Sequence, residues 1–237
     1  MKYILMGYGK MGKTIEKALE TSESQLIATI DNPDELAEKE NFLDNADVAF
    51  EFSTPESAYD NILACFRHNL PVVCGTTGWT DRLPEIENIC NNDGKTMMYA
   101  PNYSIGINIF IAINNQIADI ISNLNMYGIS MSETHHVHKK DAPSGTALQI
   151  KNQILQHLAN SSMKNADIPI SSIREGEVTG IHEVKYTSDF DTIELKHTAK
   201  TRDAFAYGAI LAAKWLKDKK GCFKMQDVIK SLYFCKF

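Results

Sequence analysis

A run of basic side chains lies in the middle of the sequence, in the stretch THHVHKKDAPSGTAL at residues 134–148. In a chain of net charge -6, this stretch gathers His135, His136, His138, Lys139 and Lys140. Histidine is the side chain best suited to transfer a proton near neutral pH. A partly buried lysine among other cations can have its pKa lowered toward that range. These residue types therefore predict a site that binds an anionic group and protonates it.

The residues that follow this run predict the start of a helix. Ser144 or Thr146 can act as its N-cap, so that the free backbone N–H groups of the first turn face the basic loop. A carboxylate at that place meets helix-end donors and a cationic side chain together. We therefore expect the loop to bind a small dicarboxylate.

Other interpretations of this stretch stay open. It can be a solvated loop before an ordinary helix cap, or a metal site formed by His135, His136, His138 and Asp141. Because adjacent histidines seldom point at one metal ion and lysines repel a cation, no metal is expected.

A second basic cluster ends a predicted strand near the end of the chain. His197, Lys200 and Arg202 can close the same pocket, although charges at a strand end are more often surface residues. No role is predicted for the three histidines that stand alone in the sequence, His68, His157 and His182.

The segment GYGKMG forms a G-x-G-x-x-G motif between a predicted strand and a predicted helix. Gly7 permits a tight turn, Gly9 lets the backbone approach a pyrophosphate, and Gly12 lets the helix pack on the strand. Asp31 ends the next predicted strand, where an acid binds ribose hydroxyls. The motif predicts a dinucleotide site, and its alternative is an ordinary turn with a solvated acid. Since this acid repels a 2′-phosphate, NADH is the preferred cofactor, although Lys10 also allows NADPH.

Two further segments follow predicted strands of the first half of the chain. They are CGTTGW at 74–79 and YAPNYS at 99–104. The carboxyl ends of parallel strands line the ligand crevice of an open sheet. Backbone groups at Gly75, Thr76 and Thr77 are therefore expected near a nicotinamide ring, with an ordinary turn as the alternative.

The first hundred residues alternate short apolar runs with helical patterns, which predicts a parallel sheet covered on both faces. Strands are predicted at 2–6, 25–31, 47–53, 71–75 and 95–100, and helices at 11–20, 54–69 and 83–92. In the second half several alternating strands follow one another with little helix between them, which predicts a sheet with one packed face and one solvated face. Helices are predicted there at 107–122, 142–158, 202–217 and 224–233, and strands at 125–136, 168–175, 177–188 and 191–200.

The fold class predicted from these elements is α/β, with a Rossmann-type parallel-sheet nucleotide domain and a second, mixed α+β domain. The last helices are expected to return to the first domain. We therefore predict a dinucleotide-binding domain at 1–103, completed by 208–237, and a substrate-binding domain at 104–207.

The composition excludes several classes of partner. With 24 basic and 30 acidic residues, the chain is a poor ligand for nucleic acid or an anionic membrane surface. No apolar run reaches about 20 residues, so neither a membrane span nor a signal peptide is expected. An odd number of scattered cysteines is typical of reduced thiols in the cytoplasm, here Cys65, Cys74, Cys90, Cys222 and Cys235.

Several motifs occur in a fixed order over nearly the whole chain: GYGKMG, GTTG, APNYSIG, ETHHVHKKDAPSGTA and HTAKTRDAFAYGAILAAKWL. Together they resemble the 4-hydroxy-tetrahydrodipicolinate reductase family, also called dihydrodipicolinate reductase. The resemblance implies a Rossmann domain with a mixed substrate domain and a homotetramer built through substrate-domain sheets. It also implies NAD(P)H-dependent reduction of a cyclic dicarboxylate in diaminopimelate and lysine biosynthesis, with loss of water.

The resemblance assigns roles to particular residues. His135 and Lys139 correspond to the catalytic pair, and His136, Gly145 and Thr146 correspond to the substrate-binding residues. The nucleotide contacts correspond to Gly7, Tyr8, Gly9, Lys10, Met11, Gly12, Asp31, Gly75, Thr76, Thr77, Ala100, Pro101, Asn102 and Tyr103.

The chain departs from the family pattern in two places. The glycine loop is one residue shorter and has Lys10 where the family has an arginine, and the region after Asp31 is short. Two alternative functions stay open, namely another two-domain dehydrogenase of the aspartate or homoserine dehydrogenase type and a non-catalytic dinucleotide sensor.

Overall fold

The computed structural model describes residues 1–20 and 23–234, so that Cys235 lies outside the described residues. The chain forms two compact units, one of Met1–Ile105 with Asp203–Phe237 and the other of Gly106–Arg202. We call them the nucleotide unit and the mixed-sheet unit. The chain crosses between them at 105 and 202, whereas the sequence prediction placed the crossings at 103 and 207. The second crossing lies earlier because helix α7 is continuous from Asp203.

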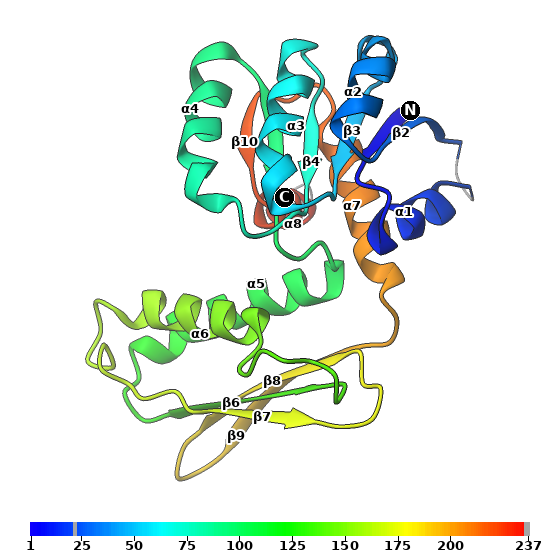
Figure 1. Ribbon diagram of the computed structural model, residues 1–237. Helices are drawn as coiled ribbons and strands as arrows, with labels where there is room; N and C mark the ends of the chain where they lie inside the picture. The colour runs from blue at the N-terminus through cyan, green and yellow to red at the C-terminus, as the bar shows by residue number, and fades with distance from the viewer. Residues whose placement is uncertain (21–22, 235–237) are drawn as a thin grey trace. The chain divides into compact units, whose positions relative to one another are not determined.

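The nucleotide unit is built on a six-stranded sheet in which every neighbouring pair is parallel (Figure 1). Its strand order is β10-β5-β4-β3-β1-β2. The strands are β1 (Lys2–Met6), β2 (Gln25–Ile30), β3 (Val48–Glu51), β4 (Val72–Cys74), β5 (Thr96–Tyr99) and β10 (Gly221–Phe223). The predicted Rossmann-type parallel sheet is confirmed.

Helices cover both faces of this sheet, because successive strand residues point to opposite sides. Tyr3 and Leu5 of β1 belong to a core with α1, α7 and α8, whereas Ile4 and Met6 belong to a second core with α3 and α4. These helices are α1 (Lys10–Glu20), α3 (Pro55–Arg67), α4 (Leu83–Asp93), α7 (Asp203–Leu216) and α8 (Met225–Phe234).

Some short elements were not predicted. Helix α2 (Pro33–Lys39) buries none of its residues, so it has no apolar period to reveal it. Its start was nevertheless readable, since Asn32 caps it by accepting a 2.9 Å hydrogen bond from the Glu35 N–H, and a proline occupies the first turn. Strand β10 and the 3₁₀ helices η1 (Glu40–Asn45) and η2 (Thr80–Arg82) were missed as well.

The mixed-sheet unit has a four-stranded sheet of order β7-β6-β8-β9. Strands β6 and β7 are parallel, and the other two pairs are antiparallel. Helices α5 and α6 pack on one face, over Met131, Val184 and Tyr186 (Figure 1). The elements are α5 (Ile105–Ser122), β6 (Gly128–His135), α6 (Gly145–Leu158), β7 (Ile170–Arg174), β8 (Gly180–Thr187) and β9 (Thr192–Ala199).

Helix α5 is apolar along most of its length. By length and composition it could cross a membrane, with a mean hydropathy of 1.3 over 18 residues. Ile107, Phe110, Ile111 and Ile121 are nevertheless buried in the core of the mixed-sheet unit. The core helix of a globular unit passes the same test of length and composition, so α5 is weak evidence for a membrane span.

Candidate active site

The glycine turn joins β1 to α1 in the nucleotide unit. Gly7 has φ +91°, a conformation that L side chains rarely adopt, and its N–H donates a 2.8 Å hydrogen bond to the Ile30 carbonyl. A Cβ at Gly7 or Gly12 would overlap neighbouring backbone atoms. At Gly9 the same position is open, with no atom within 4 Å. The turn therefore needs Gly7 and Gly12 for its shape and leaves Gly9 accessible to a ligand.

Asp31 lies next to this turn. One of its carboxylate oxygens accepts a 2.7 Å hydrogen bond from the Tyr8 N–H. The hydroxyl of Tyr8 donates to Glu16, and the Lys13 amine lies 5.5 Å from the Tyr8 ring centroid. The structure thus brings Asp31, Tyr8 and the glycine turn together, as expected for residues that surround one nucleotide.

A cavity of about 360 Å³ lies at the carboxyl ends of the strands of the nucleotide unit. Of the predicted nucleotide contacts it is lined by Met11, Gly75, Thr76, Thr77, Ala100, Pro101 and Tyr103. Phe52, Ser53, Pro55 and Phe205 complete its lining. Asn102 does not line this cavity, and its side chain accepts a 2.9 Å hydrogen bond from the Ser104 N–H.

One hydroxyl in the lining of the cavity, that of Thr76, could bind a ligand. The hydroxyl oxygen of Thr76 is buried and makes no hydrogen bond to any described residue. Because a buried hydroxyl without a partner is costly, this atom points to a bound group that supplies one. The turn around it is fixed, since the Gly75 N–H donates a 2.9 Å hydrogen bond to the Glu51 carbonyl.

A buried carboxylate supports the floor of this region, and the sequence analysis did not identify it. Glu51 is fully buried at the end of β3. It accepts hydrogen bonds from the Ser53 hydroxyl and, at 3.4 Å, from Asn61. The Cys74 thiol donates to it at 3.2 Å, and burial together with the nearby Glu51 raises the pKa of that thiol. Cys74 is thus held as a neutral donor.

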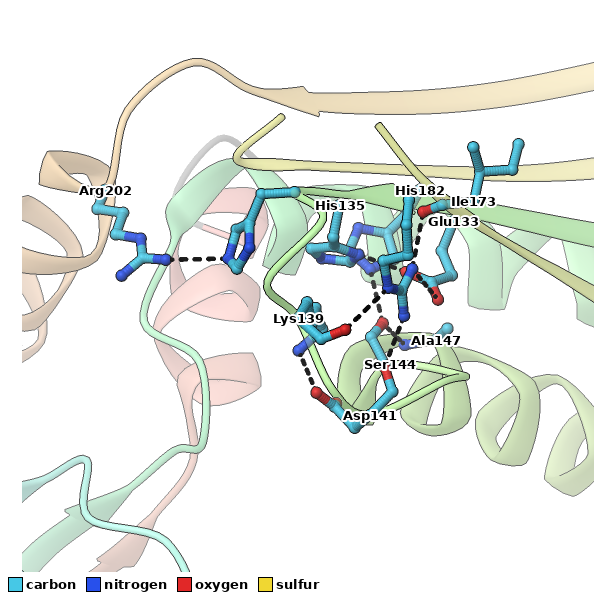
Figure 2. Close-up of polar contacts among 11 residues, drawn as sticks. Glu133, His135, Lys139, Asp141, Ser144, Ala147, Ile173, His182 and Arg202 are labelled. Atoms are coloured by element: carbon cyan, nitrogen blue, oxygen red, sulfur yellow. Dashed lines mark hydrogen bonds and ion pairs between the residues drawn. The ribbon is translucent and has the colours of Figure 1, made fainter. Parts of the chain in front are cut away.

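In the mixed-sheet unit His135 is the last residue of β6, and its ring is paired with a buried carboxylate (Figure 2). Its Nδ1 is hydrogen-bonded to Glu133, which is fully buried. Burial lowers the pKa of His135, and Glu133 opposes that effect. Burial alone would raise the pKa of Glu133, but hydrogen bonds from Ser172, His135 and Arg174 outweigh it and keep that pKa low.

Lys139 lies in the same cluster, on the loop after β6. Its amine is 2.8 Å from the Asp141 carboxylate, and its side chain is 23% exposed. The hydrogen bond from Lys139 lowers the pKa of Asp141. Figure 2 shows Lys139, Asp141, Glu133 and His135 around one small region of the loop. The predicted catalytic pair is thus brought together with two carboxylates.

The other basic residues of the loop lie differently. His136 contacts Arg202, with 3.3 Å between Nε2 and the guanidinium, while its Nδ1 is buried without a hydrogen-bond partner among the described residues. His138 is largely exposed and lies 3.3 Å from Glu177. Lys140 is exposed too. Of the second basic cluster, Arg202 therefore does reach this loop.

The helix start resolves the choice between two N-caps. Ser144 is the cap of α6, and its hydroxyl oxygen accepts a 3.2 Å hydrogen bond from the Ala147 N–H. Gly145 and Thr146 are the first two residues of the helix. The same hydroxyl is 3.3 Å from Nε2 of His182. The helix start and the basic loop are therefore linked through a histidine on β8.

His182 lies in the same cluster, although the sequence analysis gave this residue no role. It is 6% exposed, and its ring meets the His135 ring edge-on with 5.2 Å between centroids. Burial lowers its pKa to about 4, aided by His135. A signal was present in the alternation of β8, because His182 occupies the same face as Val184 and Tyr186, which are both buried.

The metal alternative has no matching geometry in the part of the chain that the structure describes. No group of three or more His, Cys, Asp or Glu side chains is placed there to hold a metal ion. The predicted ligands diverge, since His135 bonds Glu133, Asp141 pairs with Lys139, and the His136 and His138 rings are 6.1 Å apart.

Comparison with known proteins decides the family. Residues 1–103 match the family described as dihydrodipicolinate reductase, N-terminus, and residues 106–229 match the one described as dihydrodipicolinate reductase, C-terminus. The chain belongs to the dihydrodipicolinate reductase family. It is therefore an oxidoreductase that uses a nicotinamide dinucleotide.

Individual relatives agree with this assignment. The chain is 41% identical to the 4-hydroxy-tetrahydrodipicolinate reductase of Christiangramia forsetii, over 98% of this chain and 99% of the relative. It is 35% identical to that of Rickettsia rickettsii, over 94% and 95%. A solved dipicolinate-bound dihydrodipicolinate reductase from Paenisporosarcina sp. TG-14 covers 96% of this chain and 99% of that one. Its TM-score is 0.81 at 21% identity, which shows a shared fold.

The nucleotide unit fits such a cofactor. The accessible backbone at Gly9 suits a pyrophosphate. The Thr76 hydroxyl, which has no hydrogen-bond partner among the described residues, suits a polar group on the nicotinamide side.

Proposed function

We propose that the chain reduces 4-hydroxy-tetrahydrodipicolinate to tetrahydrodipicolinate in diaminopimelate and lysine biosynthesis. The substrate loses water, its ring carbon 4 gains a hydride, and the reduced nicotinamide becomes oxidised. The observation that carries the proposal is the cluster of His135 and Lys139 beside the N-terminus of α6. A lysine amine, a histidine that can take up a proton and helix-end donors together suit a ring with two carboxylates.

The roles of the nucleotide residues follow from their positions. The Gly7–Gly12 turn and the first N–H groups of α1 hold the pyrophosphate, and Asp31 binds ribose hydroxyls. The residues from Gly75 to Thr77, together with Ala100, Pro101 and Tyr103, line the cavity in which we place the nicotinamide. When bound, this cofactor supplies the hydride. The protein excludes water and orients the ring.

We infer that NADH is preferred to NADPH. Asp31, which accepts a hydrogen bond from the Tyr8 N–H of the glycine turn, is the proposed ribose-binding acid, and the first turn of α2 adds Asp34 and Glu35. Lys39, the cation of that helix, is already bonded to Glu35 and to the Thr29 carbonyl, each at 2.8 Å. A 2′-phosphate would therefore meet negative charge there, and Lys10 is the cation that could offset it.

The substrate residues divide the chemistry between them. His136, Gly145 and Thr146 hold a carboxylate and so orient the ring. His135 donates the proton that quenches charge developing on the substrate, and Lys139 stabilises that charge electrostatically. The carboxylate now paired with Lys139 belongs to Asp141, which is 56% exposed. A substrate carboxylate can replace it at little cost.

The proposed assembly is a homotetramer through the mixed-sheet units. The sheet face opposite α5 and α6 carries the exposed Ile173 and a network of charged pairs. In this network Lys185 is 2.7 Å from Glu194 and 3.2 Å from Glu183. The homotetramer is what the family resemblance implies, and this face is where we propose that a second copy packs. We propose a cytoplasmic location, in keeping with the reduced thiols of the described cysteines.

A direct assay tests the function. Freshly made substrate is mixed with the protein and either NADH or NADPH, and the absorbance of each cofactor is followed separately. We expect substrate-dependent oxidation, faster with NADH. Oxidation with aspartate- or homoserine-derived substrates alone would instead support the other type of dehydrogenase. Tight NADH binding without oxidation on any substrate would support a sensor.

A further inference from the structure

Arg174, the last residue of β7, lies at the centre of the catalytic cluster, and neither its type nor its position marked it in the sequence. It is directly opposite His135 in the parallel pairing of β6 and β7. Its guanidinium donates a 3.1 Å hydrogen bond to Glu133, the carboxylate that holds the His135 ring. The arginine therefore reaches His135 through Glu133.

The same guanidinium also holds the loop that carries Lys139. It donates to the backbone carbonyl of Asp141 at 2.6 Å and to that of Lys139 at 3.3 Å. A further hydrogen bond of 2.7 Å goes to the Ile173 carbonyl. A planar guanidinium has five N–H donors in a rigid arrangement, so it can serve these acceptors at once. A lysine amine has no such geometry.

We propose that Arg174 and Glu133 are positioning residues that keep the His135 imidazole and the Lys139 amine at a fixed spacing. Glu133 orients the ring, and Arg174 ties both Glu133 and the Lys139 loop to β7. This inference rests on the proposed function, because it takes His135 and Lys139 as the groups that act on the substrate.

The pairing also decides which ring nitrogen of His135 exchanges its proton. Hydrogen bonds from Ser172, His135 and Arg174 keep the pKa of the buried Glu133 low, so this carboxylate acts only as an acceptor. Nδ1 of His135 must then be the donor to Glu133. Nε2 is left as the nitrogen that gains and loses a proton, and it lies beside the bare Cα of Gly180.

The charges around His135 act in opposite directions. Glu133 on its own strand favours the imidazolium, whereas Arg174 on β7 and Lys139 on the loop disfavour it. His182 on β8 faces the ring as well, and burial keeps it neutral. Removing the Glu133 carboxylate and removing the Arg174 guanidinium should therefore shift the pKa of His135 in opposite directions.

The test combines two charge-removing variants with two measurements. The pKa of the His135 ring is measured by NMR titration in Glu133→Gln and in Arg174→Gln. The ring signal is assigned by its absence in His135→Gln. The pH–rate profile of each variant is also recorded. We expect the pKa of His135 to fall in Glu133→Gln and to rise in Arg174→Gln, each by about one unit. The limb of the pH–rate profile that reports His135 should move with it. Shifts in the same direction, or none, would overturn the proposal.

A third variant tests whether the hydrogen bonds of Arg174 fix the loop that carries Lys139. Arg174→Lys keeps the charge but loses the planar set of donors, so the pKa of His135 should stay near that of the wild type while kcat falls about tenfold. Full turnover in this variant would refute the tie between Arg174 and the Lys139 loop. It also keeps the test decisive should Glu133→Gln fail to fold.

A matched control removes another carboxylate–histidine pair of the same unit. Asp119 is 2.5 Å from His157, between α5 and α6, and Asp119→Asn should leave the His135 titration and kcat unchanged. The outcomes also separate this inference from the proposed function. Suppose that the pKa of His135 falls in Glu133→Gln and rises in Arg174→Gln but kcat does not change in any variant. The positioning of the ring is then correct and the catalytic role of His135 is wrong.

Discussion

The candidate binding regions of the two units consist of different kinds of chemical group. In the nucleotide unit most of the features that suit a ligand are backbone shape and neutral groups, such as the Gly7 turn and the Thr76 hydroxyl, which has no hydrogen-bond partner in the described part of the chain. In the mixed-sheet unit they are charged side chains, with His135, Glu133 and Arg174 in one buried or half-buried cluster. The first kind of region can hold a ligand in place, and the second can also move a proton. The difference teaches that binding and proton transfer can be disturbed separately in this protein.

The largest effect expected is on turnover. His135→Ala and Lys139→Ala should each lower kcat by about 10² or more, because general acid catalysis and charge stabilisation are lost. The dissociation constant for NADH should stay unchanged, since neither residue belongs to the nucleotide unit. Steady-state kinetics and calorimetric titration with NADH check the two halves of this expectation.

The same loop offers a matched control for this prediction. His138 is exposed and lies next to Lys139, so His138→Ala removes a basic side chain without touching the cluster. It should keep near-wild-type kcat. Wild-type turnover in both His135→Ala and Lys139→Ala would remove the basis for contrasting the two regions.

The next effect is on stability in acid, and its sign differs between the regions. The pKa of His182 is lowered from 6.5 to about 4 in the folded protein, so the unfolded chain binds the proton more readily. The free energy of unfolding therefore rises with pH between about 4 and 6.5. Acidification across this window should cost at most about 3 kcal/mol. His135 and His197 have lowered pKa values and add to the same trend.

His68 in the nucleotide unit behaves in the opposite way. Its hydrogen bond to Asp44 raises its pKa, so its contribution is present below pH 6.5 and is lost as the pH rises through the folded value. Urea unfolding between pH 4.5 and 7.5 checks both signs. His182→Gln should flatten the loss of stability in acid, and His68→Gln should not. An unchanged acid dependence in His182→Gln would contradict the neutral, buried state of that ring.

The smallest effect compares the two helix caps of known geometry. Ser144→Ala and Asn32→Ala each remove a side-chain acceptor from a helix start, so each should lower the free energy of unfolding by about 1 kcal/mol. Only Ser144 also contacts His182. The NMR titration of His182 should therefore change in Ser144→Ala and stay the same in Asn32→Ala. If the titration of His182 were the same in both variants, the Ser144–His182 contact would have no effect on the pKa of His182.

Much of the nucleotide unit was predictable, because its signals are local. A glycine with positive φ, a proline in a first helical turn and an acid at a strand end each act within a few residues of themselves. The same holds for the helix start at Ser144, although its neighbour Thr146 was an equal candidate in the sequence. Helix α2 shows the limit, since a short element with no fully buried residue has no clear apolar pattern.

By itself the sequence determined the order of the longer strands and helices, the glycine turn and the basic loop with His135 and Lys139. Only the tertiary structure decided which charges meet. Glu133 and Arg174 are 41 positions apart in the chain and meet because β6 and β7 pair in one register. A shift of that register by one residue would send their side chains to opposite faces of the sheet. Backbone preferences depend on neighbouring residues and can be predicted from a short stretch of sequence, whereas the pairing of buried charges depends on how distant strands align.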